Sequence, residues 1–89
     1  MMSRRLCFID KAWGEYVYWQ GQDRKTLKRI NTLIEATSRE PFEGIGKPKV
    51  LLGDMSGFWS RRIDERHRLV YAVDDYDLTI LACRYQYGE

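Results

Sequence analysis

The chain has only one histidine, two cysteines and two prolines, and the shortage of the first two excludes several classes of site. Cys7 and Cys83 lack the paired spacing of a zinc site, and two cysteines are too few for a disulfide scaffold. Each lies in an apolar run, so we expect both to be reduced core residues and expect no metal. His67 would have to serve any scheme that pairs a nucleophile with histidine, and no GxSxG motif accompanies it.

Long apolar runs are also missing. The basic start, MMSRRLCFID, contains only the short apolar run LCFI, too short for a secretory signal or a membrane span, which predicts a cytoplasmic location and no membrane partner. The 89 residues allow one domain with one modest core, and no large enclosed cavity for a cofactor. We therefore expect a single domain over residues 1–89 that holds no cofactor.

Positive charge is unevenly distributed along the chain. The whole sequence has a net charge of +2, but the segment from Gly44 to Arg68 alone holds six cations against three acids. A local basic surface suits a partner that carries phosphate groups. The alternative interpretation is that these charges only solvate strand edges and turns.

Two segments have helical periodicity. The first begins near Asp10, a candidate N-cap, and places these residues at helical spacing: Trp13, Tyr16, Val17 and Gln20. The second covers about residues 24–38 and has an apolar face made of Leu27, Ile30, Leu33 and Ile34. Gly21 and Asp23 supply a short turn between them, so we expect an antiparallel helix hairpin whose aromatic residues lie in the core.

The remaining segments predict strands. They are residues 4–9, a short KVLL run, and the three stretches 57–64, 68–73 and 78–87. Hairpin-length linkers join the last three, which predicts an antiparallel meander, whereas the prolines and glycines of residues 40–49 predict a loop. The expected fold is α+β, with an N-terminal strand and a helix hairpin packed on one face of a mainly antiparallel sheet. The other face is left partly open.

Strand alternation predicts which side chains reach that open face. If the apolar residues Trp59, Ile63, Leu69, Tyr71 and Val73 face the helices, Arg62 and Arg68 emerge together on the other side, and Arg61 does not. Lys47 and Lys49 would lie at the rim of this face. His67 precedes Arg68 and should point away from it, as a turn or strand-edge residue.

The candidate site is therefore a cluster of arginines and lysines joined by Tyr87 near the C-terminus. Arginine offers a planar fork that matches phosphate oxygens and stabilises transition-state charge, and tyrosine can stack on a base or transfer a proton. The alternative is that Arg62 and Arg68 form ion pairs with acidic residues across strands.

Four stretches of the chain resemble a known family: WGEYVYWQ, INTLIEATSREPFEGIGKP, SGFWSRRIDERHRLVYAV and ACRYQY. Together they are similar to the YoeB family of toxins, within the RelE/ParE superfamily, from about Trp13 to Tyr87. The resemblance implies a microbial-ribonuclease-like fold and cleavage of messenger RNA in the ribosomal A site. The implied partners are a YefM-type antitoxin and the ribosome with its messenger RNA, and could include a second copy of the chain.

The resemblance also implies roles for individual residues. Arg62 and Arg68 match the phosphate-binding arginines of the family, and Tyr87 matches the tyrosine that orients the cleaved nucleotide. Lys49 stands where the family has a glutamate as general base, and Leu52 where it has a lysine. Gln86 stands where it has a histidine as general acid, and a neutral amide supplies no proton.

These departures leave three functions open. In the first, the chain is a ribosome-dependent endoribonuclease in which Lys49 accepts a proton or stabilises charge, while Gln86 only holds position. In the second, it is a weakened toxin that occupies the ribosome and the antitoxin without efficient cleavage. The third is a ParE-like inhibitor of gyrase, which SGFWSRRI and HRLVY disfavour because both stretches resemble YoeB.

Overall fold

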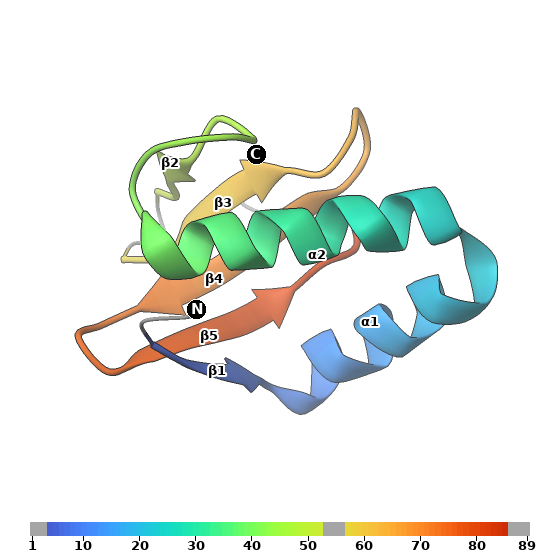
Figure 1. The fold of residues 1–89 in the computed structure, drawn as a ribbon, viewed down its shortest axis with the longest axis horizontal. Helices are drawn as coiled ribbons and strands as arrows, with labels where there is room; N and C mark the ends of the chain where they lie inside the picture. The colour runs from blue at the N-terminus through green and yellow to red at the C-terminus, as the bar shows by residue number, and fades with distance from the viewer. Residues whose placement is uncertain (1–3, 53–56, 86–89) are drawn as a thin grey trace.

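A computed structural model describes residues 4–52 and 57–85, as a sheet with two helices packed on one face (Figure 1). The elements are β1 (Arg5–Phe8), α1 (Asp10–Gln22), α2 (Arg24–Arg39), β2 (Lys49–Val50), β3 (Trp59–Arg62), β4 (Arg68–Val73) and β5 (Asp77–Ala82). The five strands lie in the order β1-β5-β4-β3-β2. The predicted α+β architecture with a helix hairpin on one sheet face is confirmed.

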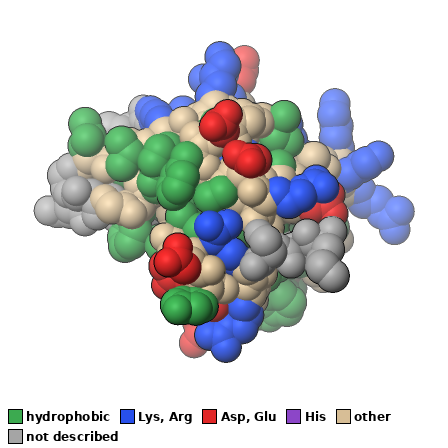
Figure 2. All heavy atoms as spheres, turned by 60° about the vertical axis from the view of Figure 1, so that its left-hand side comes forward, with side chains coloured by type: hydrophobic (Ala, Val, Ile, Leu, Met, Phe, Trp, Pro, Cys, Tyr) green, Lys and Arg blue, Asp and Glu red, His purple; other side chains and the backbone are tan. Residues whose placement is uncertain are grey.

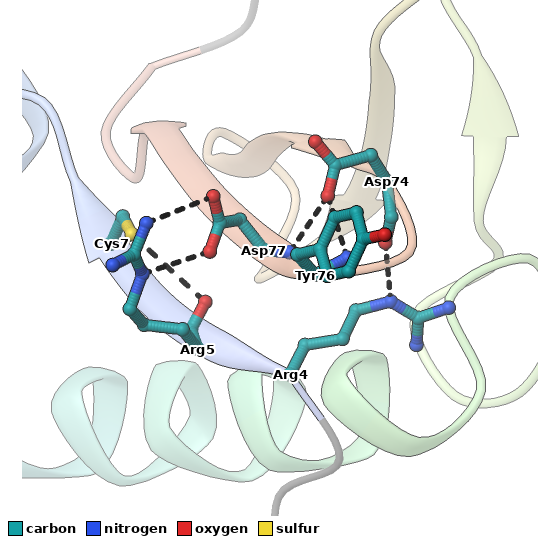
Figure 3. A network of polar contacts seen from close by, with 6 residues as sticks. All are labelled: Arg4, Arg5, Cys7, Asp74, Tyr76 and Asp77. Carbon is teal, nitrogen blue, oxygen red and sulfur yellow. Dashed lines mark hydrogen bonds and ion pairs between the residues drawn. The ribbon is translucent and has the colours of Figure 1, made fainter.

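The sheet is antiparallel except at one edge. β2, β3, β4 and β5 pair in antiparallel fashion, while β1 joins β5 in parallel. Arg5 of β1 forms an ion pair with Asp77 of β5, with 2.9 Å between Nε and Oδ1, and Arg4 Nε donates to the Asp74 carbonyl at 2.7 Å (Figure 3). The Asp74 carboxylate in turn accepts two backbone N–H groups of the same hairpin, so the β4–β5 turn is tied to the first strand.

The second helix has the apolar face and the cap that its sequence predicts. Ile30, Leu33 and Ile34 are buried against the sheet. Asp23 is the N-cap, and its Oδ1 accepts the backbone N–H groups of Lys25 and Thr26 at 3.0 and 3.1 Å. The hydrogen bonds from Thr26 hold the pKa of the Asp23 carboxyl below its usual value.

The first helix differs from the prediction in its N-cap and in the tryptophan that it buries. Its N-cap is Ile9, and Asp10 is instead the first helical residue, where its charge favours the positive end of the helix dipole. Trp13, expected in the core, is 52% exposed, although its ring still stacks on Tyr16. The buried tryptophan is Trp19, because its indole N–H donates to the carbonyl of Cys83 at 2.8 Å.

The main core lies between the helices and the sheet, and Cys83 belongs to it. Burial is the main cause that raises the pKa of the Cys83 thiol to about 12, and the charge of Glu15 adds to it. Cys7, also expected in the core, is only half-buried and is not among the core residues. The helix side of the sheet is therefore the side that stabilises the fold.

Two inner strands of the sheet, β3 and β5, are shorter than their sequence patterns predict. β3 covers 59–62 instead of 57–64, and β5 ends at Ala82, so the predicted strand does not continue to 85. The reason lies in Cys83, whose N–H donates to Glu15 Oε1 and whose carbonyl accepts from Trp19, so both backbone groups bond to α1 and not to a strand. Within residues 4–52 and 57–85, no helix is long and apolar enough to cross a membrane.

Candidate functional site

Two arginines meet at one end of the β3–β4 ladder. Arg62 and Arg68 are Cα partners across these antiparallel strands, and directly paired residues present their side chains on the same face of a sheet. Arg62 is exposed and Arg68 is half-buried. Among the described residues, the Arg62 side chain forms no ion pair, so cross-strand pairing with an acid does not explain it. The predicted juxtaposition of these arginines is confirmed.

A serine and a lysine extend this face. Ser60 is fully buried, and its hydroxyl oxygen accepts a hydrogen bond from Arg68 Nη1 at 3.4 Å. Lys49 of β2 is the Cα partner of Ser60, which places Lys49 on the same side of the sheet as the arginines, at its exposed edge. Ser60 is not among the predicted site residues, although its spacing of two from Arg62 predicts that both lie on one face. We call Lys49, Ser60, Arg62 and Arg68 the arginine face.

Arg61 lies on the opposite side and organises the loop that precedes β2. Its guanidinium is fully buried and donates to the carbonyls of Ile45 at 3.1 Å and Glu43 at 3.0 Å, and also to the carbonyl of Glu40. Its Nε donates to the Tyr71 hydroxyl at 3.3 Å. This cation is therefore satisfied mainly by backbone oxygens, and it fixes the course of the loop.

Tyr71 and Gly46 complete this anchor. The Tyr71 hydroxyl donates to the Pro41 carbonyl at 2.6 Å. Burial raises the pKa of this hydroxyl, and the hydrogen bond and charge of Arg61 offset only part of the rise. Gly46 has a φ of 82°, which favours glycine, and a Cβ there would lie 2.8 Å from Leu33 Cδ2. Any other residue at this position would therefore strain the backbone and displace the Leu33 side chain. The Gly46 carbonyl accepts the Arg62 N–H, which links the loop directly to the arginine face.

The other expected site residues are not part of the arginine face. Lys47, with a φ of 51°, is exposed and lies two residues before β2, near the rim as predicted. Leu52 is 76% exposed. Gln86 and Tyr87 lie outside the described residues, so their roles remain predictions.

His67 lies in the β3–β4 turn, as predicted. Its backbone N–H donates to Asp64 Oδ1 at 2.8 Å, and its ring packs edge-on against Trp19 and close to Tyr85. The sequence predicts the place of His67 in the turn but not the partners of its ring. The contacts of its ring with α1 and with the chain after β5 could not be read from strand parity.

One side of the surface is mixed in charge. On the side shown in Figure 2, Lys and Arg side chains are scattered among acidic and hydrophobic ones, and they form no uniform basic patch. The described part of the chain contains no group of His, Cys, Asp or Glu side chains that could hold a metal ion.

Comparisons with known proteins agree with this geometry. Residues 8–87 match the model of a family described as YoeB-like toxin of bacterial type II toxin-antitoxin system. Toxin YoeB of Escherichia coli K12 is 55% identical over 83 residues, which cover 93% of this chain and 99% of that protein. The structure of the YoeB dimer from Staphylococcus aureus has a TM-score of 0.89 and 42% identity, and covers 96% of this chain and 99% of its own.

A second solved structure contains a partner. The heterotetrameric YoeB-YefM toxin-antitoxin complex from Staphylococcus aureus matches with a TM-score of 0.86 and 42% identity, over 94% of this chain and 98% of that one. These likenesses extend over nearly the whole chain and therefore include the strands that carry the arginine face.

Proposed function

This chain belongs to the family of YoeB-like toxins of bacterial type II toxin-antitoxin systems, and we propose that it is an endoribonuclease that cuts messenger RNA on the ribosome. The observation that carries the proposal is the Arg62–Arg68 pair on the open face of the sheet. Like charges directly opposite each other destabilise a sheet, so their juxtaposition favours a bound anion. A phosphodiester between two guanidinium groups supplies that anion.

The chemistry follows from these side chains. In the reaction that the family resemblance implies, a ribose 2′-hydroxyl attacks the adjacent phosphorus, the 5′-oxygen leaves, and a 2′,3′-cyclic phosphate remains. Arg62 and Arg68 would stabilise the negative charge that builds on the phosphate oxygens. The hydrogen bond from Arg68 to Ser60 restrains one guanidinium before RNA binds, which reduces the entropy lost on binding.

The site lacks the usual general acid and general base of the family it resembles. Lys49 lies on the arginine face, and by the family resemblance it stands where a glutamate serves as general base, so it is the proposed acceptor of the 2′-hydroxyl proton. Gln86 has no proton to give to the 5′-oxygen. A missing acid or base costs about 10²–10⁴-fold in rate, so we expect the proposed cleavage to be slow.

The proposed partners are an antitoxin of the YefM type and the ribosome with messenger RNA in its A site. The complex of a YoeB relative with YefM supports the first, and the YoeB dimer supports self-association as a further state. An acidic segment of the antitoxin would cover the arginine face and so compete with RNA. Co-expression and purification at high salt should retain the pair, because apolar contacts are not screened.

One experiment tests the proposal. The purified chain is added to ribosomes programmed with a defined messenger RNA, and the cut ends are mapped. We expect slow cleavage at the A-site codon that leaves a 2′,3′-cyclic phosphate.

The position of Lys49 and the identity of Gln86 favour a second candidate, a toxin that binds the ribosome without cutting. Inhibition of translation with intact message would support that candidate, and inhibition of gyrase alone would refute both.

A further inference from the structure

The residues that follow β5 are held by contacts from two separate elements. Besides the bonds of Cys83 to α1, the Arg84 guanidinium lies over the Tyr18 ring of α1 at 3.6 Å and over the Tyr85 ring at 4.7 Å. Tyr85 has a φ of 67°, a left-handed conformation that costs a non-glycine residue energy and persists only where its surroundings hold it. We call Cys83, Arg84 and Tyr85 the C-terminal clamp segment.

The β3–β4 turn supplies the other half of the clamp. The backbone N–H of Tyr85 donates to His67 Nδ1 at 2.7 Å, and the Tyr85 carbonyl accepts the backbone N–H of Arg68 at 3.0 Å. Tyr85 is thus bonded on both sides to two consecutive residues, of which the second belongs to the arginine face. The Trp19 ring packs edge-on against the imidazole at 4.9 Å and limits its rotation.

This geometry determines the state of the imidazole. A backbone N–H only donates, so Nδ1 must present a lone pair, and the single ring proton is on Nε2. A second proton, placed on Nδ1, would point at the Tyr85 N–H and break the bond. The folded arrangement of the clamp therefore requires an uncharged His67.

We propose that His67 is a positioning residue, which uses its uncharged imidazole to hold Tyr85 beside Arg68 and so helps to fix Arg68 on the arginine face. The Tyr85 carbonyl accepts the Arg68 N–H, so a shift of Tyr85 also disturbs the backbone of Arg68. The inference rests on the proposed function, because the consequence for RNA assumes that Arg68 acts on a bound phosphate. The hydrogen bond itself does not depend on that assumption.

The first test measures the clamp without RNA. Because His67 is the only histidine, the imidazole nitrogen signals in an NMR spectrum of the ¹⁵N-labelled chain belong to it alone. At about pH 8 we expect an unprotonated Nδ1 and slow hydrogen exchange at the Tyr85 amide. Two variants separate the roles of the ring: His67→Asn keeps an acceptor near the Nδ1 position and does not titrate, and His67→Phe keeps the ring and loses the acceptor. Exchange at Tyr85 should stay slow in the first and become fast in the second.

The second test measures cleavage on programmed ribosomes. His67→Phe should lower the cleavage rate about 10-fold or more at saturating ribosome concentration, because misplaced groups slow the chemical step. His67→Asn should retain most of the rate, because it keeps an acceptor for the Tyr85 N–H. A protonated Nδ1 at about pH 8, or unchanged Tyr85 exchange in His67→Phe, would overturn the clamp. Equal cleavage by both variants would overturn the positioning role, whereas a wild type that never cuts but shows the expected NMR signals would refute only the proposed function.

Discussion

Arg62 and Arg68 face each other as cross-strand partners, with no acidic residue of the described chain paired to Arg62. Like charges in directly opposed positions destabilise a sheet, whereas a phosphate bound between them, as proposed, would offset their repulsion. A cost in stability of this kind is typical of functional sites.

A first prediction follows for Arg62→Gln. Removal of one of the two charges should raise Tm by on the order of 1–5 °C and weaken ribosome-dependent cleavage, because repulsion and phosphate binding disappear together. Calorimetry and cleavage assays measure the two effects. Arg66→Gln in the adjacent exposed turn is the control and should change neither. The same rise in Tm for both variants would mean that the repulsion between the partners is negligible.

A second prediction concerns Arg61, the neighbour that points the other way. Arg61→Ala leaves backbone carbonyls and the Tyr71 hydroxyl without a donor in a buried site, and should lower the free energy of unfolding by about 3 kcal/mol or more. Arg61→Lys keeps the charge but not the fork, and should be intermediate. Urea unfolding measures both, with the exposed Arg62→Lys as control. Wild-type stability of Arg61→Lys would contradict the role given to the fork.

A third prediction gives a pH dependence. Backbone and side-chain hydrogen bonds from Thr26 lower the pKa of the Asp23 carboxyl in the folded chain, so this group stabilises the fold above its unfolded value of 3.8. That contribution is lost as the pH falls through the folded pKa. Asp23→Asn keeps an acceptor at the helix start but does not titrate, so its deficit in unfolding free energy at pH 7 should shrink towards about pH 2. Asp75→Asn, in the exposed turn between β4 and β5, is the control. A deficit for Asp23→Asn that stays constant with pH would argue against this linkage.

Strand parity explains why much of the arginine face could be predicted. The period of two along β3 and β4 separates Arg61 from Arg62 and brings Arg62 together with Arg68, and this depends only on local alternation and a short hairpin. The helical face of α2 was predictable for the same reason, since a single periodic pattern decides it.

The parts that could not be predicted depend on contacts distant in sequence. β5 ends at Ala82 because Glu15 and Trp19 bond to Cys83, which lies more than sixty residues further along the chain. The same contacts turn Trp19 inward and leave Trp13 exposed, so the buried face of α1 is rotated from the expected one, although Tyr16 still packs against the core. No local pattern reveals that His67 bonds to Tyr85 either, because strand parity gives only the side of a residue and not its partner.

A fourth prediction concerns the departures in the proton-transfer set. Gln86→His supplies an acid for the 5′-oxygen and should accelerate cleavage about 10-fold or more. Lys49→Ala should slow it, because Lys49 is the proposed proton acceptor. Single-turnover cleavage on programmed ribosomes measures both. A wild type that is inert at every pH, with activity restored by Lys49→Glu together with Gln86→His, would identify an inactivated toxin.

The central claim is that the arginine face cleaves RNA, and a comparison of Arg68→Ala with Arg39→Ala tests it most directly. Arg39 is an exposed cation at the end of α2, on the helix side of the sheet, with its own partner Glu35. We expect Arg68→Ala to lower the single-turnover cleavage rate on programmed ribosomes by about 10²-fold, the usual cost of one lost stabiliser of transition-state charge. Arg39→Ala should cut at the wild-type rate, with both variants folded. An Arg68→Ala variant as active as the wild type, or an equal loss in both, would contradict the claim.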